Sequence, residues 1–117
     1  MGKKICDRLY AMRTFIIGPG DSAKKLSAYE LFPDGTRSRA VRFGGVGYED
    51  YTTHKDPVRK EQYIARHAAN EDWTENGLMT AGFWARWLLW NKETLTESAK
   101  DIRNRFGVLV VPMPRKN

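Results

Sequence analysis

The sequence contains one cysteine, Cys6, and only two histidines among its 117 residues. A single cysteine excludes an internal disulfide and any zinc site that depends on paired cysteines. His54 and His67 lack the i,i+4 spacing of a helical metal pair, and no third ligand is evident. We therefore expect no metal and no other cofactor, and a reducing compartment as the default.

Long hydrophobic runs are also missing. Runs such as Trp87 to Trp90 are only one helical turn long, whereas a membrane-spanning helix needs about 20 apolar residues. The N-terminus is charged from Lys3 onward and has no apolar signal region. We expect a protein that is not secreted and has no transmembrane segment.

Acidic residues are outnumbered, with 14 Asp or Glu against 20 Lys or Arg and a formal net charge of +6. The two halves of the chain share this excess evenly, so there is no basic tail. A basic surface favours anionic partners, such as nucleic acid or an acidic protein face. Catalysis needs a nucleophile beside a base, paired carboxylates or metal ligands. None of these is well supplied, so we expect no enzymatic activity.

Residues 1–45 predict an antiparallel three-stranded β-meander. Arg8 to Ile17 is rich in aromatic and β-branched residues and ends at a Gly-Pro-Gly-Asp breaker. Lys25 to Phe32 and Thr36 to Phe43 follow, joined by Pro33-Asp34-Gly35, in which Asp-Gly suits a two-residue hairpin turn. The cross-strand pairs that this turn predicts are Pro33 with Thr36, Leu26 with Phe43, Ala28 with Val41 and Glu30 with Arg39.

Residues 46–107 predict three helices. The first is expected from Asp56-Pro57, an N-cap followed by proline at the first helical position, to about Ala69. The second begins near Thr80. The third opens with a capping box at Thr94 and Glu97 and ends before Gly107. The Gly44–Gly47 segment lacks the spacing of a phosphate-binding loop and is expected to be a flexible exit from the hairpin.

The last residues, 108–117, contain a short strand candidate, Val108 to Val111, closed by prolines. This strand could join the meander or offer an edge to a partner, with Val108 and Val110 as interface anchors. The predicted fold class is therefore α+β, in a single domain that spans residues 1–117.

Aromatic residues are plentiful. Three of the four tryptophans lie inside the second predicted helix, in a span of seven residues. Phe83, Trp87 and Trp90 follow helical spacing, and Trp84 widens the stripe, so we expect this helix to be buried. Trp73 lies outside it, in a predicted loop. It is the better candidate for an exposed anchor of a protein interface.

The first predicted helix carries few apolar residues and a basic side instead. Its candidate binding residues for nucleic acid or another anionic partner are Lys55, Arg59, Lys60, Tyr63 and Arg66. Arginine beside an aromatic ring suits both base stacking and protein interfaces. A solvated helix face has a similar composition, so both interpretations remain open.

Several motifs together resemble a known family. They are His54-Lys55-Asp56, Tyr63-Ile64-Ala65-Arg66-His67, Glu71-Asp72-Trp73 and the run from Gly82 to Trp90 with its Gly-Phe-Trp and Trp-Leu-Leu-Trp elements. Over about residues 43–107 the chain resembles small uncharacterised proteins encoded mainly by large nucleocytoplasmic DNA viruses. That family has no established reaction, so the resemblance implies no catalytic residue. It implies a virus particle or a viral factory in the infected-cell cytoplasm.

This context favours a non-enzymatic virion component, a minor capsid or assembly protein that binds other capsid proteins. The alternative is a basic accessory protein that binds nucleic acid through the first helix. A small enzyme of unknown reaction is the third and weakest possibility. The two binding hypotheses differ in salt dependence, because counterion release weakens nucleic-acid binding steeply as salt rises.

Overall fold

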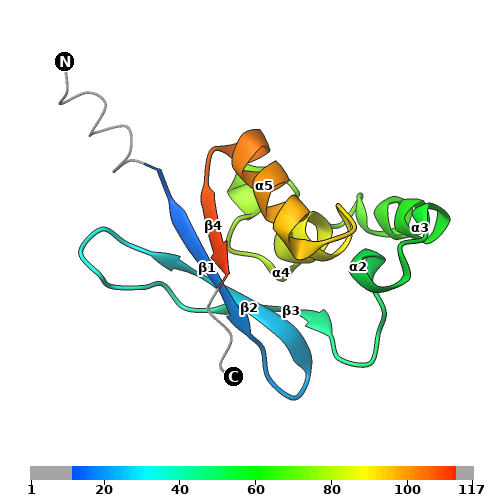
Figure 1. The fold of residues 1–117 in the computed structure, drawn as a ribbon, viewed down its shortest axis with the longest axis horizontal. Helices are drawn as coiled ribbons and strands as arrows, with labels where there is room; N and C mark the ends of the chain where they lie inside the picture. Colours follow the sequence, from blue (N-terminus) through cyan, green and yellow to red (C-terminus); the bar gives the residue numbers. More distant parts are fainter. Residues whose placement is uncertain (1–11, 113–117) are drawn as a thin grey trace.

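The computed structural model describes residues 12–112, in which a four-stranded sheet carries helices on one face (Figure 1). The strands are β1 (Thr14–Pro19), β2 (Lys24–Leu31), β3 (Val41–Gly45) and β4 (Leu109–Pro112). Their order in the sheet is β3-β2-β1-β4. Strands β1 to β3 form the predicted antiparallel meander, and β4 joins it parallel to β1. The fold class is thus α+β, as the sequence predicts.

The predicted register of the β2–β3 hairpin is confirmed in its inner part, where Leu26 pairs with Phe43 and Ala28 with Val41. Near the tip it differs by one residue. There the Phe32 N–H donates to the Thr36 carbonyl at 2.8 Å, which leaves a loop of three residues instead of two. Gly35 closes this loop at a φ of 90°, a conformation that favours glycine.

The one-residue difference gives Glu30 a different partner from the predicted Arg39. The Glu30 carbonyl accepts from the Ser38 N–H at 2.9 Å. Its carboxylate receives two hydrogen bonds from Arg13, each 2.8 Å long, on the side of β1. The predicted Glu30–Arg39 pair is therefore wrong, because the three-residue loop places Ser38 opposite Glu30. One extra residue between Ser38 and Val41 then restores the predicted register farther from the turn.

The helical part begins earlier than predicted and is more divided. Its elements are α2 (Tyr51–His54), α3 (Pro57–His67), the 3-10 helix η1 (Glu75–Gly77), α4 (Ala81–Trp84), the π-helix η2 (Ala85–Leu89) and α5 (Leu95–Phe106). The predicted caps are present. Asp56 accepts from the Val58 N–H at the start of α3, and Gly107 ends α5 at a φ of 70°.

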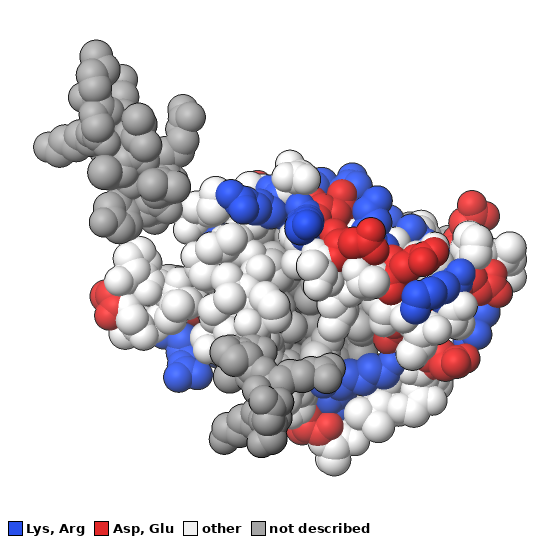
Figure 2. Space-filling model, viewed as in Figure 1, with Lys and Arg blue, Asp and Glu red and all other residues white. Residues whose placement is uncertain are grey.

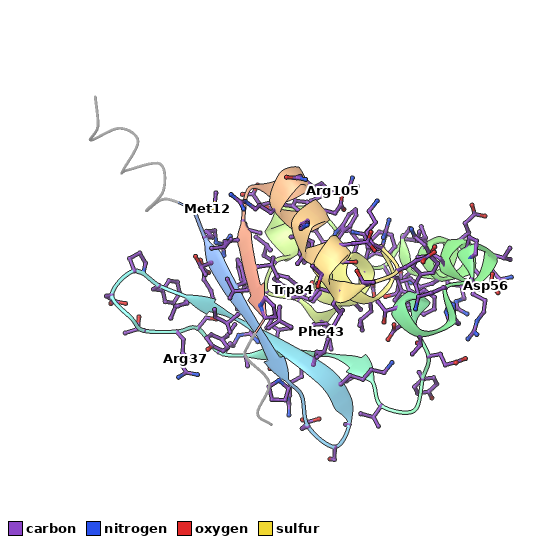
Figure 3. The ribbon with its side chains drawn as sticks, viewed as in Figure 1. Met12, Arg37, Phe43, Asp56, Trp84 and Arg105 are labelled. Carbon is purple, nitrogen blue, oxygen red and sulfur yellow. The ribbon has the colours of Figure 1, made fainter. Side chains whose placement is uncertain are left out.

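The tryptophan-rich segment lies in the centre of the molecule, between the sheet and α5 (Figure 3). Trp84 is fully buried, with its ring centroid 5.2 Å from that of Phe15 and 6.4 Å from that of Phe43. Trp87 is 8% exposed. After Trp84 the helix widens, and the Trp90 N–H donates to the Ala85 carbonyl five residues earlier. This π-turn is the part of the segment that the spacing of the aromatic residues does not predict.

Strand β4 and the residue before it complete one side of the core. Val108 and Val110 are buried with Phe15 and Ile17 of β1. No helix within residues 12–112 has the length and hydropathy that a membrane crossing requires. Cys6 and the start of the predicted Arg8–Ile17 strand lie outside the described residues.

Candidate functional site

Helix α3 brings together three of the five residues that the sequence suggests as a basic face. Arg59, Tyr63 and Arg66 recur at four- and three-residue intervals, so they share one side of the helix. Tyr63 is 7% exposed, whereas both arginines are exposed. The tyrosine therefore packs against the rest of the protein, and the two arginines lie at the surface on either side of it.

The other two residues of that set lie elsewhere. Lys55 is exposed between α2 and α3, in a left-handed conformation with a φ of 55°. The Lys60 ammonium donates to the Asn91 carbonyl at 2.6 Å and lies 4.9 Å from the ring centroid of Tyr51. Burial lowers the pKa of Lys60, and the nearby charge of Arg86 lowers it further. Lys60 therefore ties α3 to the segment after η2.

A column of stacked rings anchors α3 to the core. Tyr63 and Trp90 are parallel, 3° apart, with centroids 4.3 Å apart. His67 packs beside Tyr63 at 4.3 Å, and His54 beside Trp90 at 5.2 Å. Burial raises the pKa of Tyr63, so its hydroxyl stays protonated across the physiological range. These stacked rings have a structural role, because the two central rings, Tyr63 and Trp90, are packed between the two histidines and hold α3 against the core.

Between α3 and the end of the β2–β3 hairpin lies a groove of about 450 Å³, which we call the α3 groove. Its lining combines charged, aromatic and glycine residues: Lys24, Lys25, Phe43, Gly44, Gly45, Tyr48, Glu49, Asp50, Arg59, Tyr63, Arg66, His67, Glu71, Ala81, Gly82, Ala85, Leu89 and Trp90. Gly44 has a φ of 78°, and a Cβ there would lie 2.6 Å from Leu89 Cδ1. Glycine is needed here for the hairpin to approach η2.

The charges of the α3 groove are largely paired. Its three carboxylates each have a basic neighbour: Asp50 with Lys25 at 2.8 Å, Glu49 with Arg59 at 3.1 Å and Glu71 with His67 at 3.4 Å. Lys24 and Arg66 have no carboxylate within 4 Å among residues 12–112. The groove therefore carries two cationic side chains that are free to bind an anion.

A second groove, which we call the β4 groove, lies between α5 and the adjoining strands β1 and β4. It encloses about 370 Å³ and is lined mainly by apolar residues: Ile17, Leu88, Leu95, Thr96, Ala99, Lys100, Arg103, Leu109, Val110 and Pro112. Leu95 is 41% exposed in it. Figure 2 shows a largely uncharged region around β4, in contrast to the mixed charges over the helices. Two cations, Lys100 and Arg103, and no carboxylate belong to its lining.

The residues suggested as interface anchors are less accessible than the sequence implies. Val108 and Val110 are 3% and 9% exposed, so their side chains pack into the core. Trp73 is half-buried, its indole N–H donates to Glu71 at 3.0 Å, and the Arg86 guanidinium lies 5.4 Å from its ring. Among residues 12–112, β4 pairs on one side only, with β1, so its other backbone edge has no strand partner there.

Some lining residues could not be found from the sequence. Lys24, Tyr48 and Gly82 come from three separate segments, and no local motif connects them. Only the spacing of Arg59, Tyr63 and Arg66 on one helix gave a signal. No three potential metal ligands cluster in the part of the chain that the structure describes.

The described residues thus form an α+β fold that carries the α3 groove and the β4 groove on its surface. Residues 20–67 match the model of a family of unknown function, DUF5754. No curated protein and no solved structure matches the chain. Twelve of the eighteen residues that line the α3 groove lie within the matched segment, whereas no residue of the β4 groove does.

Proposed function

We propose that this chain is a non-enzymatic assembly protein that binds an extended segment of a partner protein along the free edge of β4. The observation that carries the proposal is the combination of this edge with the β4 groove beside it. β4 is the last strand of the sheet among the described residues. An added strand gains affinity from main-chain hydrogen bonds and specificity from pockets for alternate side chains.

The backbone of β4 is suitable for such an addition. The Leu109 N–H donates to the Arg13 carbonyl at 2.8 Å, so the backbone hydrogen-bonding groups of Leu109 point toward β1. Because successive residues of a strand direct their hydrogen-bonding groups to opposite sides, the N–H and carbonyl of Val110 point to the outer edge. Pro112 has no N–H and limits the length of that edge. The edge therefore suits a short segment.

The groove also constrains the chemistry of the partner segment. Its floor is apolar, and Lys100 and Arg103 stand one helical turn apart on its α5 side. A partner strand with apolar side chains toward the groove and one or two carboxylates toward α5 complements both features. A second copy of this chain would bring the same cations together and fits less well.

The resemblance of residues 43–107 to proteins of large DNA viruses supplies the context of the proposal. The partner would be another protein of the virus particle, most simply a capsid protein. The site of action would be the virion or the viral factory in the infected cell.

Site-specific photo-crosslinking tests this function. A photoreactive phenylalanine replaces Thr96 in the β4 groove of the full chain, expressed in its source cells. The crosslinked partner and the contact segment are identified by mass spectrometry. We expect one protein whose contact segment is extended and acidic, and we expect Lys100→Glu with Arg103→Glu to reduce its yield about tenfold.

The matched control is Arg59→Glu with Arg66→Glu, the same charge change at the α3 groove. It should leave the crosslink at position 96 unchanged. A photoreactive residue at exposed Arg39 controls for non-specific capture. Equal loss of yield in both double variants, or the same proteins captured from position 39, would refute binding at β4.

Nucleic-acid binding at the α3 groove is the second candidate, favoured by the two unpaired cations Lys24 and Arg66. Fluorescent single- and double-stranded oligonucleotides are titrated at about 50 and 200 mM salt, a range over which phosphate contacts weaken strongly. Arg59→Glu with Arg66→Glu should abolish the binding, and Lys100→Glu with Arg103→Glu should reduce it much less. No binding at the lower salt excludes this candidate.

A further inference from the structure

We propose that the α3 groove binds a nucleoside monophosphate, with the base stacked on Tyr48 and the phosphate between Lys24 and Arg66. This inference goes beyond the proposed assembly function and does not depend on it, because the two grooves have no lining residue in common. It rests on an exposed aromatic ring as the platform, on two cations without a carboxylate within 4 Å among residues 12–112 and on the size of the groove.

The platform is the ring of Tyr48. Its residue is 77% exposed, the highest value among the large hydrophobic side chains within residues 12–112. A Cβ on Gly45 would lie 2.9 Å from Tyr48 Cδ2, so the ring lies against the glycine backbone. The Lys25 ammonium donates to the Tyr48 carbonyl and to Asp50. The Lys25 hydrogen bond thus fixes the backbone of Tyr48 and the ring lies beside Gly45, while its exposure leaves ring surface on which a base can stack.

The cations are placed around this platform. Lys24 pairs with Gly45 across the β2–β3 ladder, which brings it beside the tyrosine. Arg66 comes from α3, the facing wall of the groove. Asp50 and Glu49 form ion pairs with Lys25 and Arg59, and Glu71 accepts a hydrogen bond from the Trp73 indole and lies 3.4 Å from His67. Lys24 and Arg66 therefore remain for a ligand. Arginine suits a phosphate because its planar guanidinium can donate two parallel hydrogen bonds.

The size and composition of the groove favour one nucleotide over a larger ligand. About 450 Å³ lies in the lower part of the range that small-molecule sites occupy. Its mixture of aromatic surface with a few convergent polar groups is typical of such sites. The segment recognised by the family match also supplies Tyr48, Lys24 and Arg66 together, so the proposed site is largely contained within it.

Isothermal titration of the full chain with AMP and UMP at low salt tests the proposal. Adenosine and inorganic phosphate are titrated separately, and each should bind at least about tenfold more weakly than AMP, because each makes only half of the contacts. A stoichiometry of one nucleotide per chain is expected. A single-stranded oligonucleotide forms a further arm that separates a free nucleotide from a unit of a strand.

Two variants examine the two halves of the site. Arg66→Gln should weaken AMP about tenfold and leave adenosine unchanged, since it removes a charge-assisted contact to phosphate. Tyr48→Ala should weaken both AMP and adenosine. Arg39→Gln, an exposed arginine outside this groove, is the matched control and should have no effect. All three positions are exposed, and unchanged circular dichroism verifies the fold.

Three results would overturn the inference: AMP that binds no more tightly than phosphate, an affinity that Arg66→Gln and Arg39→Gln change equally, or no heat of binding at millimolar AMP together with no chemical-shift change at Tyr48. Tight oligonucleotide binding without mononucleotide binding would also overturn it and would instead support the nucleic-acid candidate.

Discussion

At the scale of single residues, Glu30 is the one buried charged residue in the strands that the structure describes. It is 9% exposed, and its carboxylate is bound by both arms of the Arg13 guanidinium. These hydrogen bonds hold the pKa of Glu30 below its usual value, in spite of the opposing effect of burial. A buried carboxylate without this partner would be strongly unfavourable.

The Glu30 pair predicts a specific pH dependence. Because the folded-state pKa is lowered, the pair stabilises the protein fully above the unfolded pKa of about 4.3, and that stabilisation is lost as the pH falls below it. Glu30→Gln should therefore reduce the free energy of unfolding by about 1–3 kcal/mol at pH 7. The difference from wild type should shrink at about pH 3, as urea unfolding at both pH values can measure.

Exposed Glu61 on α3 provides the control for this experiment. Glu61→Gln should change the stability by less than about 0.5 kcal/mol at either pH. A deficit of Glu30→Gln that is the same at both pH values would show that the ion pair is not the cause.

At the scale of elements, α3 is held to the molecule by little apolar surface. Tyr63 is its only buried residue, and this ring stacks on Trp90 at 4.3 Å. The ion pair of Arg59 with Glu49 adds a contact at the surface, where such pairs contribute little. The attachment of α3, and with it one wall of the α3 groove, depends mainly on this stacked pair and on the hydrogen bond from the Lys60 ammonium to the Asn91 carbonyl.

Tyr63→Ala should therefore release α3 while the sheet stays folded. Truncation of a buried aromatic side chain costs about 3–5 kcal/mol, so the protection of the α3 amides from hydrogen exchange should fall by about two orders of magnitude or more. Amides of β1 and β2 should retain greater protection. Val58→Ala, in the same helix at 61% exposure, is the control and should change neither. Equal loss of protection in α3 and the sheet would contradict a local role.

At the scale of the whole molecule, sheet and helices share one core. The buried cluster includes Phe15 and Phe43 from the sheet, Trp84 and Leu88 from the central helical segment, and Ile102 from α5. Both ends of the described chain meet in it, since β4 pairs with β1. Neither part can bury its apolar face without the other.

We therefore expect one cooperative unfolding transition. Urea unfolding followed by tryptophan fluorescence and by far-ultraviolet circular dichroism should give the same midpoint. Trp84→Ala should lower the free energy of unfolding by about 3–5 kcal/mol in both signals, because the ring is fully buried and its N–H donates to the Leu78 carbonyl. Two separate midpoints in the wild type would mean that the sheet and the helices unfold independently.

Local sequence was enough to predict the features that depend on neighbouring residues. The caps at Asp56, Thr94 and Gly107 follow from side-chain and backbone preferences within one turn. The inner register of Leu26 with Phe43 follows from the pairing of apolar residues on one face, and an extra residue in the return strand keeps it although the turn has three residues. Burial of Trp84 follows because its helix carries apolar residues around most of its circumference.

The sequence by itself therefore determined the α+β class, the meander, the caps and the buried tryptophan segment. Tertiary structure decided the parallel pairing of β4 with β1, the partner of Glu30, the π-turn before Trp90 and the assembly of the α3 groove. The physical reason is the distance along the chain over which each interaction acts. Hydrogen-bonding and helical preferences act over a few residues, whereas pairs such as Phe15 with Val110 form only when the shared core has brought distant segments together.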